Sequence, residues 1–426
     1  MRPLNNQALL KAIAPTILAV FANYSCGAQA PDTGKVLQSS VARMIAPTVT
    51  SDDSATLAAN NLTFAVNLYQ ALDTNDGNLI FSPASISIAL AMAYAGAATT
   101  TASEMASVMQ FTLPPNRLHP AFDAFDTALT TAPSGAPENA FALTIANATW
   151  GQQGFPFLST YLDLLAEYYG AGLRTVDFIN APEPSRMAIN AWVSEETDQQ
   201  IPQLLPTGSI GSNTRLVLTD ATCFHGDWQT PFDPGSPSGT FHATSGDVSV
   251  PMMSNKLSYP VWTGTGWTGV ALPYVGGTTS MIVVVPDAGT FADFEAALTA
   301  DKLAAILAGQ GVDGGPVVMP RFKFSTAESL AATLAMMGMP DAFTSGTADF
   351  SGIDGQQDLF ISDVVHQADI AVDEKGTTAA AATGVVFVDK SAIVPTVVVD
   401  RPFLFFIVHQ PTGALVFAGR VTDPSQ

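Results

Sequence analysis

The sequence predicts an α+β protein in which most helices precede large, mainly antiparallel sheets. In the first half of the chain, apolar residues recur at three- and four-residue spacing, which is typical of helices packed by one face. After about residue 213, runs of β-branched and aromatic residues separated by Gly, Pro and Asp are typical of strands. Because the two patterns do not alternate strictly, the sequence does not favour a doubly wound parallel sheet.

The longest predicted helix covers residues 57–72, where six apolar side chains form one stripe. A second covers Ser85–Tyr94, with Ser82 as its N-cap and Pro83 in its first turn. Further helices are predicted at 103–110, 157–170, 184–198, 290–308 and 326–338. Strands are predicted at 216–224, 248–253, 269–275, 280–286, 358–374, 393–399, 402–410 and 414–421.

Charge and length exclude several classes of protein. The 426 residues contain 16 Lys and Arg against 37 Asp and Glu, a net charge of −21, which excludes nucleic acid and a heparin-like polyanion as partners. With 47% hydrophobic residues the chain has ample material for a core. Length alone favours about two or three domains, because single cores stop growing near roughly 250–300 residues.

The first 30 residues have the features of an export segment. Arg2 and Lys11 precede an apolar run at 12–22, and Ala28–Ala30 has the form of a signal-peptidase site. The run is too short to span a bilayer. We expect residues 1–30 to direct the protein to the extracellular space or the periplasm, with a plain amphipathic helix as the alternative.

The sequence around Cys26 bears on how this segment is processed, and the position of Cys223 bears on disulfide formation. Pro31 disfavours signal-peptidase cleavage, and Asn-Tyr-Ser before Cys26 is a poor lipoprotein box, so both cleavage and lipidation at Cys26 stay open. Removal of the segment leaves Cys223 alone, which excludes a disulfide framework. Residues 31–55, rich in Ser, Thr, Asp and Pro, are predicted to be a disordered linker before a folded body over 56–426.

The common catalytic motifs are absent from the sequence. It has no Gly-x-Ser-x-Gly, His-Glu-x-x-His, phosphate-cradling or dinucleotide-binding pattern, and its five histidines do not fall at zinc-ligand spacing. Ser82 or Ser85 with His366 and an acid could form a triad, but no elbow or oxyanion loop accompanies them. Buried polar groups that satisfy one another are the favoured interpretation, so neither an enzyme nor a metal or cofactor is predicted.

Residues 376–388 form an uncharged stretch after a predicted strand. Its side chains are mostly small, and Thr377, Ala379 and Ala381 would share one face of a strand. Small residues can enter a packed sheet without overpacking it. From composition alone, a flexible Ala-rich surface loop is the competing interpretation.

With these residues in view, the sequence resembles the serpins from about Ala55 to Gln426. The motifs occur in the family's order, and together they are specific although each alone is weak. They are Asn78–Ile86, Ala146–Trp150, Ile189–Val193 with Thr197 and Ile201, Leu216–Leu218 with Phe224, Gly226 and Trp228, Leu272–Tyr274 with Ser280 and Met281, the stretch from Asp373, Asp400–Ile407, and Gly419–Val421.

The resemblance implies a single large domain with three mainly antiparallel sheets and about nine helices, acting as a monomer. It also implies an exposed reactive loop over about 374–396, cut between Lys390 and Ser391. A target serine protease would then be trapped as an acyl-enzyme while residues 376–390 enter the main sheet. Fourteen steps at roughly 3.3 Å span about 45 Å.

The hinge of this loop has the small residues that inhibitory relatives need, because charge, bulk or proline would block insertion. Thr378 replaces an acid common in the family. Glu374 starts the hinge, and the small residues are Gly376, Thr377, Ala379, Ala380, Ala381 and Ala382. A non-inhibitory serpin-like binding protein and a cross-class inhibitor of cysteine proteases are the alternatives.

Lys390 favours a trypsin-like target with a carboxylate in its specificity pocket. Asp389 would repel enzymes with acidic subsites. If the cut falls after Phe387 or Val388 instead, a chymotrypsin-like or elastase-like target is favoured, and a subtilisin-like one also stays open.

The resemblance also places two polar clusters where the main sheet must part. The shutter consists of Ser82, Ser85, Asp220 and His366, and the breach of Trp228, Arg321 and Glu374. Asp220 stands where the family usually has Asn, so it could pair with protonated His366 and make opening sensitive to pH. Simple core hydrogen bonding is the competing interpretation.

Overall fold

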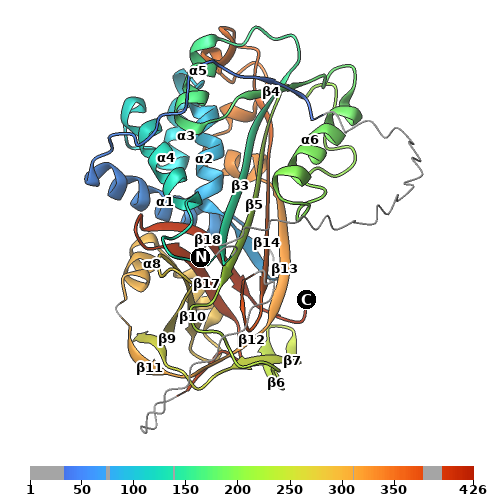
Figure 1. Ribbon diagram of the computed structural model, residues 1–426. Helices are drawn as coiled ribbons and strands as arrows, with labels where there is room; N and C mark the ends of the chain where they lie inside the picture. Colours follow the sequence, from blue (N-terminus) through green and yellow to red (C-terminus); the bar gives the residue numbers. More distant parts are fainter. Residues whose placement is uncertain (1–32, 73–76, 138–139, 310, 378–395) are drawn as a thin grey trace, which may run out of the picture. The chain divides into compact units, whose positions relative to one another are not determined.

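The main sheet has seven strands in the order β1-β4-β3-β5-β15-β14-β13 in the computed structural model (Figure 1), which describes residues 33–72, 77–137, 140–309, 311–377 and 396–426. The bounds are β1 Lys35–Leu37, β4 Leu173–Val176, β3 Phe141–Gln152, β5 Leu216–Asp227, β15 Gly376–Thr377, β14 Ile361–Val372 and β13 Phe322–Ser329. Strand β5 pairs directly with β14 in parallel over 216–222, whereas β15 lies between them near residue 226.

Two further sheets complete the β-structure of the described residues. The second has the order β11-β8-β9-β10-β17-β18-β2, and the third β16-β12-β7-β6. The bounds are β11 Val312–Gly315, β8 Tyr259–Gly264, β9 Trp267–Pro273, β10 Thr279–Pro286, β17 Phe403–His409, β18 Ala414–Val421, β2 Leu79–Phe81, β16 Val397–Val398, β12 Val317–Pro320, β7 Gly246–Ser254 and β6 Ser238–Ala243.

Ten α-helices occur in the described residues, close to the number expected. Helices α1 to α4 lie on one face of the main sheet and α6 on the other (Figure 1). Their bounds are α1 Ser51–Leu72, α2 Pro83–Tyr94, α3 Thr99–Met109, α4 Pro115–Thr130, α5 Ser159–Tyr169, α6 Pro182–Glu196, α7 Phe291–Ala296, α8 Ala300–Leu307, α9 Ala331–Met337 and α10 Ser351–Asp354. No helix in the described part of the chain is long and apolar enough to cross a membrane.

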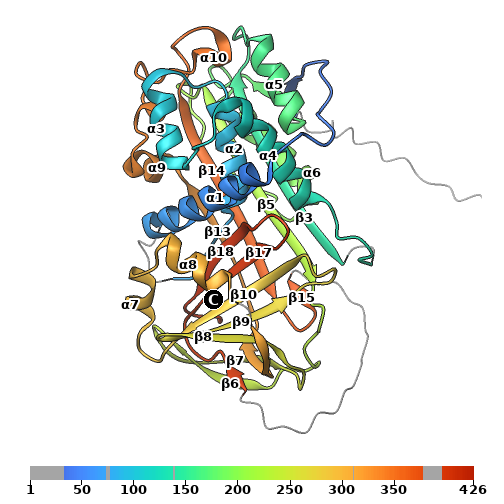
Figure 2. The same ribbon diagram turned by 90° about the vertical axis from the view of Figure 1, so that its left-hand side faces the viewer.

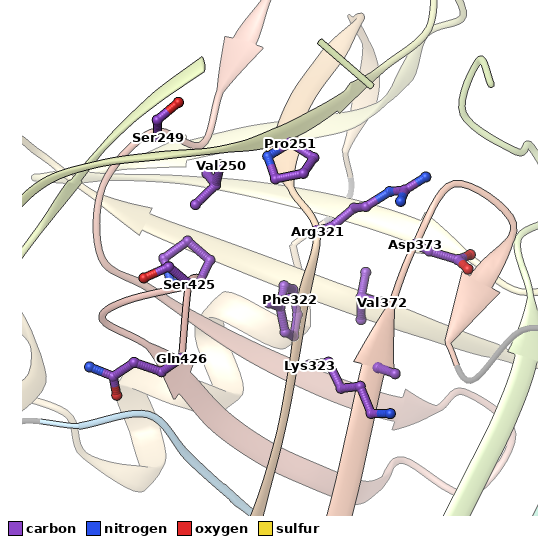
Figure 3. Close-up of a pocket in the computed structure, with 12 residues that line it drawn as sticks. Ser249, Val250, Pro251, Arg321, Phe322, Lys323, Val372, Asp373, Ser425 and Gln426 are labelled. Atoms are coloured by element: carbon purple, nitrogen blue, oxygen red, sulfur yellow. The ribbon is translucent and has the colours of Figure 1, made fainter. Parts of the chain in front are cut away.

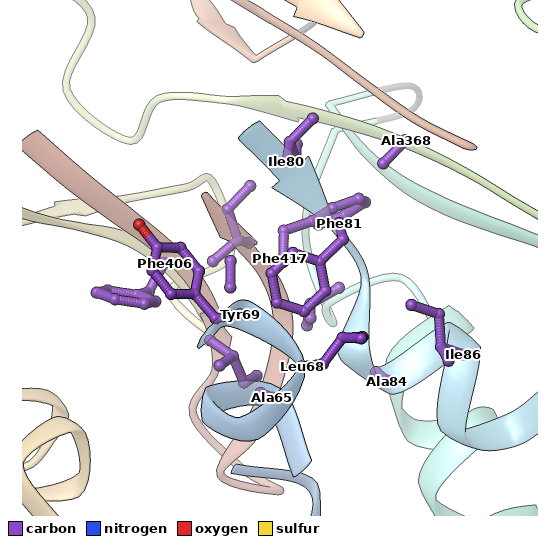
Figure 4. Packing of buried hydrophobic residues seen from close by; sticks show 14 of the residues in the cluster. Ala65, Leu68, Tyr69, Ile80, Phe81, Ala84, Ile86, Ala368, Phe406 and Phe417 are labelled. Atoms are coloured by element: carbon purple, nitrogen blue, oxygen red, sulfur yellow. The ribbon is translucent and has the colours of Figure 1, made fainter. Parts of the chain in front are cut away.

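Helix α1 packs by its apolar stripe, as the periodicity predicts, and the surface that it covers is the second sheet. Leu68 and Tyr69 of α1 pack against Phe406 of β17 and Phe417 of β18 (Figure 4), and Figure 2 shows these strands beside α1. All four side chains are buried. Because interiors are close-packed, this half of the molecule gives the site a stiff support.

The cap predicted for α2 is confirmed. Ser82 precedes the helix in an extended conformation, and its hydroxyl accepts a hydrogen bond from the Ser85 backbone N–H at 3.2 Å. Pro83 occupies the first turn, where its missing N–H costs no hydrogen bond. This turn brings both serines to the middle of the main sheet.

The organisation of the chain corrects three expectations. The disordered linker expected over 31–55 is wrong for residues 33–55, which contain β1 and the start of α1. Residues 33–426 form one compact unit, so the several domains suggested by length are not found there. The helix expected over 326–338 is wrong at its start, because 326–329 belong to β13. Strand β3 and helix α4 were not predicted.

Candidate functional site

The described part of the hinge is seated in the main sheet. Gly376 and Thr377 form β15 between β5 and β14, with Thr377 opposite Gly226 on one side and Val372 on the other. A Cβ on Gly376 would lie 2.1 Å from the Gly226 carbonyl oxygen, so no larger residue fits there without a shift of the backbone. The main sheet therefore already admits the first two residues of the uncharged stretch.

The side chain of Thr377 is anchored inside the protein. Its hydroxyl lies 2.7 Å from the hydroxyl of Tyr274, and both residues are buried. Burial raises the pKa of Tyr274 well above its ordinary value, so the phenol stays protonated as a hydrogen-bonding partner. This contact between Tyr274 and the hinge was not predicted, since it spans 103 residues of chain.

The breach residues meet directly beneath the hinge. Trp228 stacks on Tyr274 with ring centroids 4.6 Å apart, and its indole N–H donates to the Asp373 carbonyl at 2.9 Å. Arg321 forms an ion pair with Glu374. The predicted grouping of Trp228, Arg321 and Glu374 is thus present in the structure.

Glu374 is held by more than its ion pair. Burial raises the pKa of its carboxyl, but hydrogen bonds from Ser236 and Arg321 outweigh burial and lower the pKa below its ordinary value. Its backbone carbonyl also accepts a hydrogen bond from the Phe232 N–H at 2.8 Å. The ionised carboxylate therefore ties the start of the hinge to the segment before β6, through Ser236, and to the junction of β12 and β13, through Arg321.

A cavity of about 480 Å³ opens beside the breach. Phe322 and Val372 line it with the cations Arg321 and Lys323, and Figure 3 shows these side chains near the C-terminal residue Gln426. Asp373 also lines it, so the charges at its wall are mixed. The cavity thus lies beside the paired ends of β13 and β14, and no residue of β5 or β15 lines it.

The shutter residues also come together, at the point where β5 and β14 pair directly. Asp220 and His366 face each other across the two strands, and Nδ1 of His366 lies 3.1 Å from Oδ1 of Asp220. Both residues are fully buried. The hydroxyl of Ser85 donates to the same Asp220 oxygen at 2.7 Å.

The backbone of Ser82 fixes the tautomer of His366. Its N–H donates to Nε2 of His366 at 3.1 Å, so Nε2 is unprotonated and the neutral ring carries its proton on Nδ1. The Ser82 hydroxyl donates to the Val416 carbonyl at 2.8 Å. Through its hydrogen bonds, Ser82 therefore links the start of α2 to β14 and to strand β18 of the second sheet.

A second carboxyl beside the shutter, that of Glu328, was not predicted from the sequence. Glu328 of β13 lies opposite His366, so Asp220, His366 and Glu328 form a row across three strands. Burial raises the pKa of Glu328 above its ordinary value. The three residues align only because of the strand register, and the register could not be predicted from the sequence.

Several predicted residues cannot be located. Ala379, Ala380, Ala381, Ala382, Lys390, Ser391 and the export-segment residue Cys26 lie outside the described residues. Cys223 is buried with a free thiol. Within the part of the chain that the structure describes, no group of three or more His, Cys, Asp or Glu side chains could hold a metal ion.

Fold and site together define an α+β protein whose main sheet accommodates a short additional strand next to β14. The family model described as Serpin (serine protease inhibitor) matches residues 59–424. The chain is 37% identical over 387 residues to the leukocyte elastase inhibitor of Bos taurus, with 86% of this chain and 99% of the relative covered. It is 38% identical over 380 residues to Serpin B6 of Pongo abelii, with the same coverage.

The similarity extends to solved structures. Uncleaved ovalbumin superposes with a TM-score of 0.77 at 26% identity, covering 87% of this chain and all of that one. The chain therefore belongs to the serpin family. Its relatives are named as protease inhibitors, so the protein is a member of an inhibitor family rather than an enzyme.

Proposed function

We propose that this protein inhibits serine proteases as a suicide substrate. The target protease attacks the carbonyl carbon of Lys390, the bond to Ser391 breaks, and Ser391 leaves with a new amino terminus while an ester joins Lys390 to the protease. The loop then continues into the main sheet from the position where β15 already lies. The protein acts as a monomer in this proposal.

The observation that carries the proposal is the seated hinge. Gly376 and Thr377 already pair with β5 and β14, and the residues that follow in the sequence, 378–388, are uncharged. Insertion therefore extends the strand pairing that Gly376 and Thr377 already make with β5 and β14. No charged side chain of the loop before Asp389 has to be buried. The neutral composition also argues against the non-inhibitory alternative.

Incubation with trypsin tests the proposal. We expect an SDS-stable complex of the two proteins, and mass spectrometry should find a released peptide that begins at Ser391. The matched variant Lys390→Ala should lose the trypsin complex, whereas Lys256→Ala, a lysine elsewhere on the surface, should retain it. Rapid turnover of the loop without a complex would contradict inhibition.

A second target class is favoured by the relatives named leukocyte elastase inhibitor. Cleavage after Phe387 or Val388 would suit a chymotrypsin-like or elastase-like enzyme. A panel that includes elastase-like, subtilisin-like and cysteine proteases separates the classes, because the released peptide would begin at Val388 or Asp389 instead of Ser391. A complex with a cysteine protease alone would support cross-class inhibition.

We also propose that residues 1–30 direct export. The support is the pattern of Arg2, Lys11, the apolar run and Ala28–Ala30. Mass spectrometry of the exported protein should find a mature amino terminus near residue 31. Retention of Cys26 with an attached lipid would favour the lipoprotein route, and an intact Met1 in a cell extract would contradict export.

A further inference from the structure

Residues 33–50, which we call the brace, form an ordered segment along one edge of the main sheet. Strand β1 pairs with β4 in antiparallel register, with Val36 opposite Arg174. The hydroxyl of Thr175 donates to the Lys35 carbonyl at 3.1 Å. A Cβ on Gly172 would lie 2.8 Å from the Leu37 carbonyl oxygen, so the two strands approach closely. The brace thus covers the backbone groups of β4 that would otherwise form a free edge.

Arg174 links the start of the brace to α6. Its guanidinium donates to the Thr33 carbonyl at 3.2 Å and lies 4.7 Å from the ring centroid of Trp192 on α6. Burial lowers the pKa of Arg174 from its ordinary value although it remains a cation. A partly desolvated cation over an indole ring is a favourable contact. Helix α6 on one face of the sheet is therefore joined to the brace at the sheet edge.

Arg43 links the end of the brace to α4. Its Nε lies 2.7 Å from Oδ1 of Asp123, and its Nη2 lies 2.6 Å from Oδ2 of Asp126. The side chain of Asp123 is fully buried, and burial raises the pKa of this carboxyl while Arg43 acts to lower it. Loss of Arg43 would leave this buried carboxylate without its cation, which is strongly unfavourable.

Helix α5 provides two further contacts. The hydroxyl of Ser39 donates to Asp163, and the Met44 backbone N–H donates to the Glu167 carbonyl at 2.8 Å. Leu37 and Val49 pack against the core. The brace, of about eighteen residues, therefore connects four elements. It pairs with β4 at the sheet edge, contacts α4 and α5, and reaches α6 through Arg174.

We propose that the brace restrains opening of the main sheet and so keeps the inhibitor in its form with the loop outside. This inference rests on the proposed function, in which β5 must separate from β14. Strand β3 pairs with β5, and β4 pairs with β3, so both strands move with β5, whereas the brace holds β4 to α4 through Arg43. Arg43 and Arg174 are positioning residues, because neither contacts the gap between β5 and β14.

The test compares full-length variants Arg43→Met and Arg174→Met with Lys256→Met, which removes the same charge from an exposed residue far from residue 43 in the sequence. Each protein is held at one elevated temperature, and the native fraction is followed on a urea-gradient gel. We expect the half-life of the native form to fall about tenfold in the first two variants and to stay unchanged in the control.

The rate of backbone hydrogen exchange in α6 distinguishes the brace from a local role of Arg43. If Arg43 only stabilised its contact with α4, its loss would leave the exchange of α6 unchanged. We expect faster exchange over 182–196 in Arg43→Met, although Arg43 contacts α4 and not α6. An unchanged half-life, or faster exchange confined to α4, would overturn the brace. If Arg43→Met does not fold, the double variant Arg43→Met with Asp123→Asn removes the buried charge together with its partner and is measured instead.

Failure of the brace and failure of the proposed function are distinguishable in this design. Half-life and exchange require no protease, so they decide the brace even if the wild type forms no covalent complex. Conversely, a normal trypsin complex with an unaltered half-life in Arg43→Met would retain the proposed function and overturn the brace alone.

Discussion

The two polar clusters of the main sheet differ in how far the sheet has opened around them. At the breach, β15 separates β5 from β14, and Thr377 is held by Tyr274. At the shutter, β5 and β14 pair directly, and Asp220 and His366 are completely buried. The sheet is thus parted at one end and closed in the middle, which places the resistance to further insertion at the shutter.

The two clusters also differ in how far water can reach their charged and polar groups. Glu374 of the breach pairs with Arg321, whose side chain is 45% exposed, so water can replace part of the lost contact when the pair separates. The shutter has no exposed member, and each of its groups must find a new partner when the strands part. The breach can therefore rearrange at lower cost than the shutter.

The largest expected effect comes from a charge at the seated hinge. In Thr377→Arg the guanidinium would have to be buried beside Tyr274, so insertion should stop and the protein should become a substrate. We expect the inhibition stoichiometry to rise at least about tenfold and the SDS-stable complex to disappear. Thr377→Ala, which removes the hydroxyl without adding bulk, should keep the complex, and an unimpaired Thr377→Arg would contradict insertion at this position.

The ion pair of the breach comes next. Glu374→Ala should ease premature insertion, shorten the native half-life several-fold and promote polymers, because Arg321 and Ser236 lose their shared acceptor. Glu374→Gln, which keeps an acceptor for Ser236, should lie between wild type and Glu374→Ala. Native gels after heating measure both effects. A Glu374→Ala protein that neither polymerises nor loses half-life would show the breach assignment to be wrong.

The pH dependence of the breach has a defined sign. Because the pKa of Glu374 is lower in the folded protein than its ordinary value of 4.5, its stabilisation is present above that value and is lost as pH falls through the lower, folded pKa. The wild-type half-life should therefore shorten below about pH 4.5. In Glu374→Ala this acid-dependent component should be missing, and equal acid profiles would exclude Glu374 as its source.

The shutter should show a smaller, few-fold effect. Asp220 and Glu328 both face His366, and the Ser82 N–H donates to its Nε2, so these contacts must change when β5 and β14 part. We expect loss of either carboxylate to change the native half-life about two- to fivefold.

Asp220→Asn, with Glu328→Gln as a second variant, tests this response of the shutter. Each substitution removes one carboxylate that faces His366, and the profile of inhibition stoichiometry across pH 5–8 is compared with that of the wild type. Matching profiles for wild type and Asp220→Asn would eliminate the pH hypothesis and leave simple hydrogen bonding as the role of the shutter.

Local sequence patterns predicted the elements whose signals are strong over a few turns or residues. The stripe of α1 and the Ser82 cap of α2 were predicted, although α1 begins six residues before the predicted range of 57–72, and the strands β5, β10, β17 and β18 were predicted close to their observed bounds. Strand β3 was missed because its sequence, FALTIANATWGQ, mixes small and polar residues. Helix α4 was missed because Pro120 interrupts its pattern.

Of the site, the sequence predicted which residues belong together but not their geometry. The resemblance grouped Asp220 with His366 and Arg321 with Glu374, and the structure brings both pairs into contact. It did not indicate Tyr274 beside Thr377 or Glu328 opposite His366, since such contacts depend on strand register. A shift of one residue would turn these side chains to the opposite face.

The sequence by itself determined the fold class, the acidic charge and the uncharged stretch after Gly376, because these properties reside in residue types and local spacing. The tertiary structure alone decided that the sheet is parted at the breach and closed at the shutter. It also decided that residues 33–50 are ordered. Arg43 and Asp123 are 80 residues apart in the sequence, and only the folded chain brings them into contact. Such long-range contacts leave no periodic trace in the sequence.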